Sequence, residues 1–185
     1  MNKLVLLFFI FLSHIIYCQI SEGQKFCEET KGGPYFPISE FNFSKKIFWY
    51  KTFYKETKEG IKVIDGKTYY EFKQEWQEKN ISMLYMREEN GVIYQYEESL
   101  KKETIRYDPK FTEGYSWKSA DGKDSYKIIS YHGELRTPYC EYKNLLVIEA
   151  NVSFGKFKFY YLKGHGYIGA TKDHKLVSCL SPEYN

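Results

Sequence analysis

Apolar and polar residues alternate along most of the chain in runs of strand length. In residues 67–76, for example, Tyr70 and Phe72 share one parity of the sequence, whereas Glu71 and Lys73 share the other. A period of two places the aromatic side chains on one face of a strand and the charged side chains on the other. The pattern therefore predicts a half-buried strand, and similar patterns recur to the end of the chain.

Turn signals separate these runs and predict β-hairpins. Three dipeptides favour tight turns in which both residues adopt positive φ: Asp65-Gly66, Asn90-Gly91 and Asp121-Gly122. No stretch between them has the apolar stripe of an amphipathic helix. The strands that we predict are residues 46–54, 61–64, 67–76, 83–88, 92–96, 104–107, 115–118, 125–131, 142–152, 154–162, 167–170 and 175–180.

Strands in this succession, without helical spacers, predict an all-β domain. An antiparallel meander must bury one face, and without covering helices it does so by curling on itself. We therefore expect an antiparallel meander that curls into an open half-barrel. The alternative is a two-layer β-sandwich.

The amino-terminal segment is typical of an exported protein. A positive start is followed by the unbroken apolar run 4–12, and the chain becomes polar at Gln19, which predicts a signal peptide over residues 1–18. Cleavage between Cys18 and Gln19 would release a periplasmic or extracellular protein. The alternative is a lipoprotein anchored through Cys18. Residues 19–45 then form a loosely structured lead-in, and residues 46–185 form a single β domain.

Composition narrows the class of function. Among 185 residues, 27 basic side chains are nearly balanced by 24 acidic ones, and lysines and glutamates are interleaved along the strands. This mixture argues against a nucleic-acid partner, which requires clustered positive charge. The mean hydropathy of −0.56 excludes a polytopic membrane protein, and we expect no transmembrane helix in the mature chain.

Three cysteines follow the signal peptide, and none belongs to a C-x-x-C pair. An oxidising compartment permits one disulfide among them. Cys140 opens one long predicted strand and Cys179 closes the last one, so in a meander several strand spacings of about 4.8 Å separate them. We therefore expect Cys27, in the lead-in, to pair with either Cys140 or Cys179.

Candidate catalytic groups are few. His132, His165 and His174 lie beside glycine or aspartate in predicted turns, and none has the spacing of a metal site. The sequence therefore indicates no catalytic residue, metal or cofactor. One alternative stays open, a hydrolase in which His165 or His174 acts with Cys179 or with a carboxylate such as Asp173.

Several strand-and-turn motifs resemble those of a broad group of uncharacterised exported bacterial β-sheet proteins and lipoproteins. The matching segments are IDGKTYY (64–70), YMR (85–87), NGVIYQY (90–96), EGYSW (113–117), TPY (137–139), YKN (142–144), YY (160–161) and GHG (164–166). The resemblance implies a curved antiparallel sheet and identifies no chemistry. Where the group commonly has glycine after the Thr-Pro turn, this chain has Cys140, which suggests a disulfide specific to this protein.

Aromatic residues make up 19% of the chain, and 19 of them are tyrosines. Their rings can stabilise the sheet as cross-strand pairs or line a groove for a ligand. We therefore expect a non-catalytic exported protein that binds an apolar or sugar-like small ligand, or an envelope protein, at the cell envelope. The alternatives are a purely structural scaffold and the hydrolase described above.

Overall fold

The computed structural model describes residues 27–28, 30, 32–41 and 44–182. The expected signal peptide, residues 1–18, and the cleavage point between Cys18 and Gln19 lie outside the described residues. Within the described part, the chain forms twelve strands and no helix. The strands are β1 (Lys45–Trp49), β2 (Thr52–Ile64), β3 (Lys67–Trp76), β4 (Ile81–Glu89), β5 (Val92–Glu97), β6 (Lys102–Tyr107), β7 (Ser116–Lys118), β8 (Ser125–Arg136), β9 (Glu141–Val152), β10 (Gly155–Leu162), β11 (Gly166–Lys172) and β12 (Lys175–Ser181).

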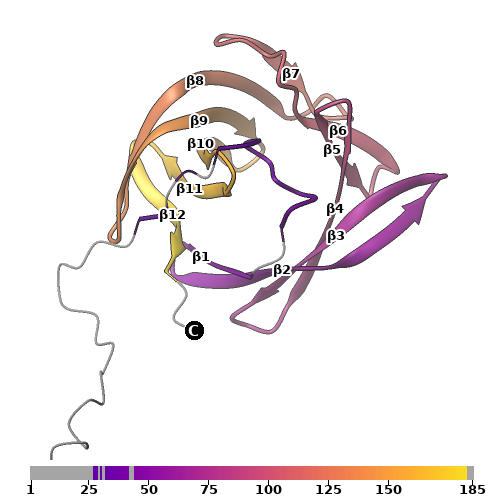
Figure 1. Ribbon diagram of the computed structural model, residues 1–185, viewed down its shortest axis with the longest axis horizontal. Coiled ribbons are helices and arrows are strands. Elements are labelled where there is room, and N and C mark those ends of the chain that lie inside the picture. The colour runs from indigo at the N-terminus through magenta and orange to yellow at the C-terminus, as the bar shows by residue number, and fades with distance from the viewer. Residues whose placement is uncertain (1–26, 29, 31, 42–43, 183–185) are drawn as a thin grey trace, which may run out of the picture.

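The strands form one antiparallel sheet in the order β6-β5-β4-β3-β2-β1-β12-β11-β10-β9-β8-β7. The first and last strands, β1 and β12, pair with each other, whereas the consecutive strands β6 and β7 lie at the two edges. The sheet therefore curls into a nearly closed, barrel-like shape with a seam between β6 and β7 (Figure 1). The predicted all-β meander in a half-barrel is confirmed, and the sandwich alternative is wrong.

Side chains bridge the seam where the backbone ladder stops. Thr104 on β6 is buried, and its hydroxyl accepts a hydrogen bond of 3.0 Å from the backbone N–H of Ala120, which follows β7. A side-chain bridge satisfies an amide at the sheet edge without continuing the strand pairing. The two edges therefore lie close together although β6 and β7 are not paired strands.

The tight hairpins predicted at Asp65-Gly66 and Asn90-Gly91 are present. Asp65 and Asn90 adopt φ of 49° and 54° in their turns. At Asp121-Gly122 only the glycine adopts positive φ, and β7 and β8 are joined by the longer loop 119–124, so the predicted two-residue turn is wrong there.

One predicted strand is also wrong. Residues 46–54, predicted as one strand, instead form β1, a turn at Tyr50 with φ of 53°, and the start of β2. Aromatic residues occur at both odd and even positions of this segment because the segment contains two paired strands instead of one. The two strands form a hairpin whose turn lacks the glycine or asparagine that usually marks one.

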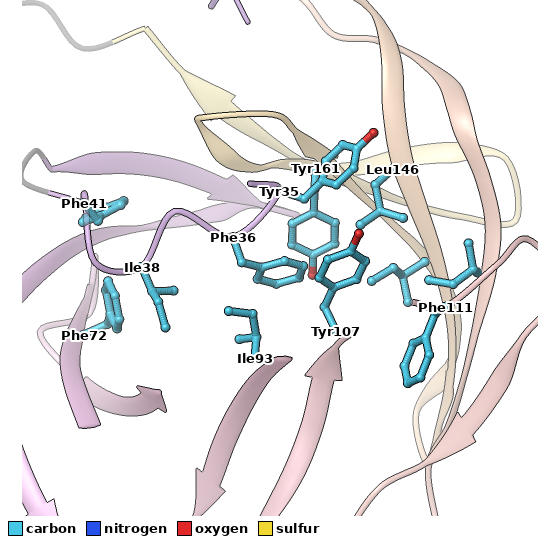
Figure 2. Packing of buried hydrophobic residues seen from close by; sticks show 12 residues of the cluster. Tyr35, Phe36, Ile38, Phe41, Phe72, Ile93, Tyr107, Phe111, Leu146 and Tyr161 are labelled. Atoms are coloured by element: carbon cyan, nitrogen blue, oxygen red, sulfur yellow. The ribbon is translucent and has the colours of Figure 1, made fainter. Parts of the chain in front are cut away.

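The lead-in contributes directly to the core. Residues 32–41 form no strand or helix, yet Tyr35, Phe36, Ile38 and Phe41 are at most 8% exposed. In Figure 1 this segment crosses the space that the sheet encloses. Figure 2 shows the Phe36 ring beside those of Tyr107 and Tyr161, with centroid separations of 5.5 Å and 4.5 Å. The lead-in therefore supplies the apolar contacts that a one-layer sheet lacks on its concave face.

Candidate binding site

Two spaces lie inside the curled sheet, and Phe36 lines both of them. The first, which we call the inner cavity, has a volume of about 180 Å³ and lies between residues 36–41 of the lead-in and strands β1 to β6, β10 and β11. The second, which we call the tyrosine cleft, has a volume of about 720 Å³. Its walls include residues 33–36 of the lead-in, the ends of β6 and β10, and part of β8.

Three tyrosine rings from distant parts of the chain define the tyrosine cleft. Tyr35 follows Pro34 in the lead-in, Tyr107 ends β6, and Tyr131 lies in β8. The ring of Tyr35 is 6.1 Å from that of Tyr107 and 5.9 Å from that of Tyr131, measured between centroids. Edge-to-face and tilted contacts at these separations are favourable for aromatic rings. The cluster therefore holds its rings in fixed orientations at the cleft.

The hydroxyls of Tyr35 and Tyr107 stay protonated at neutral pH. Burial, together with the nearby Tyr131, raises the pKa of Tyr35. Burial is also the main cause that raises the pKa of Tyr107, and a hydrogen bond with Tyr131 adds to it. A neutral phenol both donates and accepts hydrogen bonds. The cleft thus combines apolar rings with polar groups that suit hydroxyl-bearing ligands.

Charged groups are sparse around the cleft. Lys143, Lys163 and Glu88 line it, and the Nζ of Lys163 lies 5.4 Å from the centre of the Tyr35 ring. His132 also lines the cleft and is exposed. A small-ligand site is typically apolar with a few convergent polar groups, and this lining has that character.

The inner cavity has a polar row across three neighbouring strands. Cross-strand register places Lys45 on β1 opposite Glu56 on β2, and Glu56 opposite Gln74 on β3. The Gln74 amide donates a hydrogen bond of 2.7 Å to the Glu56 carboxylate, and the Lys45 ammonium donates to the backbone carbonyl of His165. Burial lowers the pKa of Lys45 to about 8, although Glu56 opposes the shift.

The structure separates His174 and Asp173 from Cys179. His174 and Asp173 form the exposed turn between β11 and β12, and Cys179 lies five residues along β12, about 16 Å away at the usual rise of a strand. Burial raises the pKa of the Cys179 thiol to about 11, which disfavours the nucleophilic thiolate. The imidazole Nδ1 of His165 is 3.7 Å from a carboxylate oxygen of Glu28.

No group of three or more His, Cys, Asp or Glu side chains that could hold a metal ion occurs among the described residues. His132, His165 and His174, the candidates from the sequence, lie in three separate places. His132 is in β8, His165 precedes β11, and His174 is in the turn after β11.

The structure supports a disulfide, and its partners are Cys27 and Cys140. Their Cα atoms are 5.0 Å apart, within the usual range for a disulfide. Cys179 keeps a buried free thiol on β12, three strands away from β9 in the sheet. The disulfide ties the lead-in to the start of β9 and fits an oxidising compartment. The described residues include no helix with the length and hydropathy to cross a membrane.

Sequence reasoning missed most residues of both spaces. Tyr35 and Phe36 lie in a stretch rich in glycine and proline, without the alternation that marks a buried strand. The glutamate and lysine of the polar row, Glu56 and Lys45, belong to a strongly charged sequence that is typical of solvated strand faces. The one usable signal in the sequence was the high content of aromatic residues. It indicated a ligand groove but not its position.

Comparison with known proteins finds no matching protein-family model, no similar curated protein and no similar solved structure. The geometry of the two spaces therefore carries the functional interpretation.

Proposed function

We propose that this protein is a non-catalytic exported protein that binds a small sugar-like or apolar ligand in the tyrosine cleft, at the cell envelope. The observation that carries the proposal is the cleft of about 720 Å³ with the rings of Tyr35, Tyr107 and Tyr131 in its walls. That volume falls within the range of about 300–1,000 Å³ found for small-molecule sites. Signal-peptide cleavage after Cys18 and membership of the resembling group of exported β-sheet proteins are parts of the same proposal.

The chemistry of the cleft favours a neutral, hydroxyl-rich ligand. Aromatic faces pack against the apolar face of a sugar ring, and phenol hydroxyls bond to its hydroxyl groups. Asn144 adds an amide that can donate and accept, next to Lys143. The Cys27–Cys140 disulfide supports the exported location, because such bonds persist in oxidising compartments.

A purely structural role is the second candidate, and the lead-in favours it. Phe36 packs against Tyr107 and Tyr161, so part of the aromatic surface is used within the core. A scaffold of this kind would need the rings for stability alone. It would bind no small ligand in the cleft.

Titration with a panel of oligosaccharides and neutral aromatic compounds, followed by calorimetry and NMR, tests the proposal. We expect saturable binding of at least one class of compound. Tyr131→Ala should bind that compound about tenfold more weakly, which corresponds to a loss of about 1.4 kcal/mol in binding free energy. Tyr131→Phe keeps the ring and removes the hydroxyl, which in the structure donates a hydrogen bond to the backbone carbonyl of Phe111. Tyr50→Ala is the matched control, because Tyr50 is 56% exposed in the β1–β2 turn, outside the cleft.

Two outcomes would overturn the proposal. Absence of binding by every class would favour the scaffold, provided that circular dichroism shows the native sheet. Equal weakening by Tyr131→Ala and Tyr50→Ala would place the ligand elsewhere.

A further inference from the structure

Arg106 brings a positive charge to the inner cavity without an acidic partner in contact. It lies on β6, is half-buried, and lines the cavity. Its guanidinium group interacts with Tyr161, and its central carbon is 5.7 Å from the centre of the Tyr126 ring. Glu97 on β5 acts on it through space, but among the described residues no carboxylate oxygen lies within 4.0 Å of its nitrogens.

The other charges of the lining compensate each other. Lys45 and Glu56 are direct cross-strand neighbours, and the charge of Glu56 favours protonation of Lys45. Arg106 is therefore the excess charge, and the lining as a whole carries one net positive charge. A guanidinium group in an apolar, partly desolvated site is a strong determinant for a planar anion, because its N–H groups match a carboxylate in two parallel hydrogen bonds.

Most of the other lining residues are apolar or aromatic, although Gln74, Gln95 and His165 also line the cavity. The volume of the cavity indicates the size of ligand that fits. Phe72, Leu84, Met86 and Phe159 line the cavity together with Phe36. A cavity of about 150 Å³ with apolar walls accommodates a molecule of the size of benzene. The inner cavity, at about 180 Å³, has room for a body of that size and one small polar group.

We propose that the inner cavity is a second binding site, which takes a small monocarboxylate with an aromatic or short acyl body. The carboxylate binds the guanidinium of Arg106, and the body packs among Phe36, Phe72 and Phe159. The proposal goes beyond the function of the tyrosine cleft, because the two spaces have different linings and only Phe36 belongs to both.

Calorimetry with benzoate and with benzyl alcohol tests the charge requirement on the unmodified protein. The two probes have similar size, so binding governed by Arg106 should be at least tenfold tighter for benzoate. Arg106→Gln should abolish this preference, with benzyl alcohol bound about equally by both proteins. Arg136→Gln is the matched control, because the Arg136 side chain is 85% exposed at the end of β8, and it should bind benzoate like the unmodified protein.

Leu84→Phe tests the location without removing a charge, and it covers the case in which Arg106→Gln fails to fold. It adds volume to the cavity wall and should reduce benzoate binding at least tenfold while the sheet spectrum is unchanged. Unchanged benzoate binding by Leu84→Phe or by folded Arg106→Gln would overturn the proposal, as would equal affinity of the unmodified protein for both probes. Tyr131→Ala tests binding in the tyrosine cleft, whereas Arg106→Gln and Leu84→Phe test binding in the inner cavity. Either proposal can therefore be refuted without the other.

Discussion

The indole N–H of Trp117, on β7, donates a hydrogen bond of 2.8 Å to the backbone carbonyl of Ile105, on β6. This bond crosses the seam, so Trp117→Phe should weaken closure of the sheet. We expect a loss of about 1–2 kcal/mol in the free energy of unfolding, since a partly buried carbonyl loses its partner. Urea denaturation measures this loss in the free energy of unfolding. Trp76→Phe is the control, because the Trp76 indole donates to the exposed hydroxyl of Ser82 away from the seam; equal losses would contradict a special role for the seam.

Phe36→Ala tests whether the lead-in is part of the fold. Phe36 is 8% exposed and packs against the rings of Tyr107 and Tyr161. Its truncation should cost about 3–5 kcal/mol, the usual range for a buried phenylalanine. Phe154→Ala, at a ring that is 66% exposed, should change stability by no more than about 0.5 kcal/mol. Thermal and urea unfolding compare the two, and similar stabilities would show that the lead-in is dispensable.

Cys140→Ser should remove the covalent tie between the lead-in and β9. The disulfide closes a loop of 113 residues, and its loss should cost about 2–4 kcal/mol. The unmodified protein should lose a similar amount in a reducing agent, whereas Cys140→Ser should be insensitive to reduction. Cys179→Ala keeps the disulfide and should retain that sensitivity. Peptide mapping that joins Cys27 to Cys179 would contradict the assignment.

Glu103 makes stability depend on acid pH. Burial alone would raise the pKa of Glu103, but hydrogen bonds from Arg87, Lys67 and Tyr69 hold it at about 2. Its contribution is therefore fully present above the unfolded pKa near 4.3 and is lost as the pH falls towards 2. From the difference between the two pKa values, we expect a loss of roughly 3 kcal/mol over that interval.

Urea unfolding at several pH values checks this contribution. Glu103→Gln should be less stable at pH 7 and should show a weaker loss between pH 4.5 and pH 2. Glu89→Gln is the control, because the Glu89 side chain is 59% exposed although it also pairs with Arg87. An identical acid profile for all three proteins would refute the role of Glu103.

Local signals in the sequence were sufficient for much of the sheet. Asp65-Gly66 and Asn90-Gly91 define their hairpins because the turn depends on residues adjacent in sequence. The β1–β2 turn escaped prediction because Tyr50 adopts positive φ without the residue types that favour it. The backbone N–H of Tyr50 donates a hydrogen bond of 2.7 Å to the carbonyl of Val177 on β12, which is a tertiary contact that the local sequence does not indicate.

The candidate sites could not be predicted because they depend on register and on closure. Glu56 faces Lys45 only through the pairing of β1 with β2, and the Arg106 guanidinium meets Tyr161 only because the sheet curls. The burial of Tyr35 and Phe36 likewise depends on where the lead-in crosses the enclosed space. Alternation along one strand identifies its inward face, but it does not show which distant side chains share that face.

The pairing of β1 with β12 has a consequence for the order in which the molecule can fold. Every other pairing in the described sheet joins consecutive strands, so the halves β1–β6 and β7–β12 can each form from local hairpins. The register Trp49 with Ser178 must instead close a loop that spans most of the chain. The entropy cost of closure rises only slowly with loop length, but non-local contacts delay the crossing of the folding barrier. Docking of the two halves at β1 and β12 is therefore the natural rate-limiting step, and substitutions there should slow folding more than equally destabilising substitutions within a hairpin.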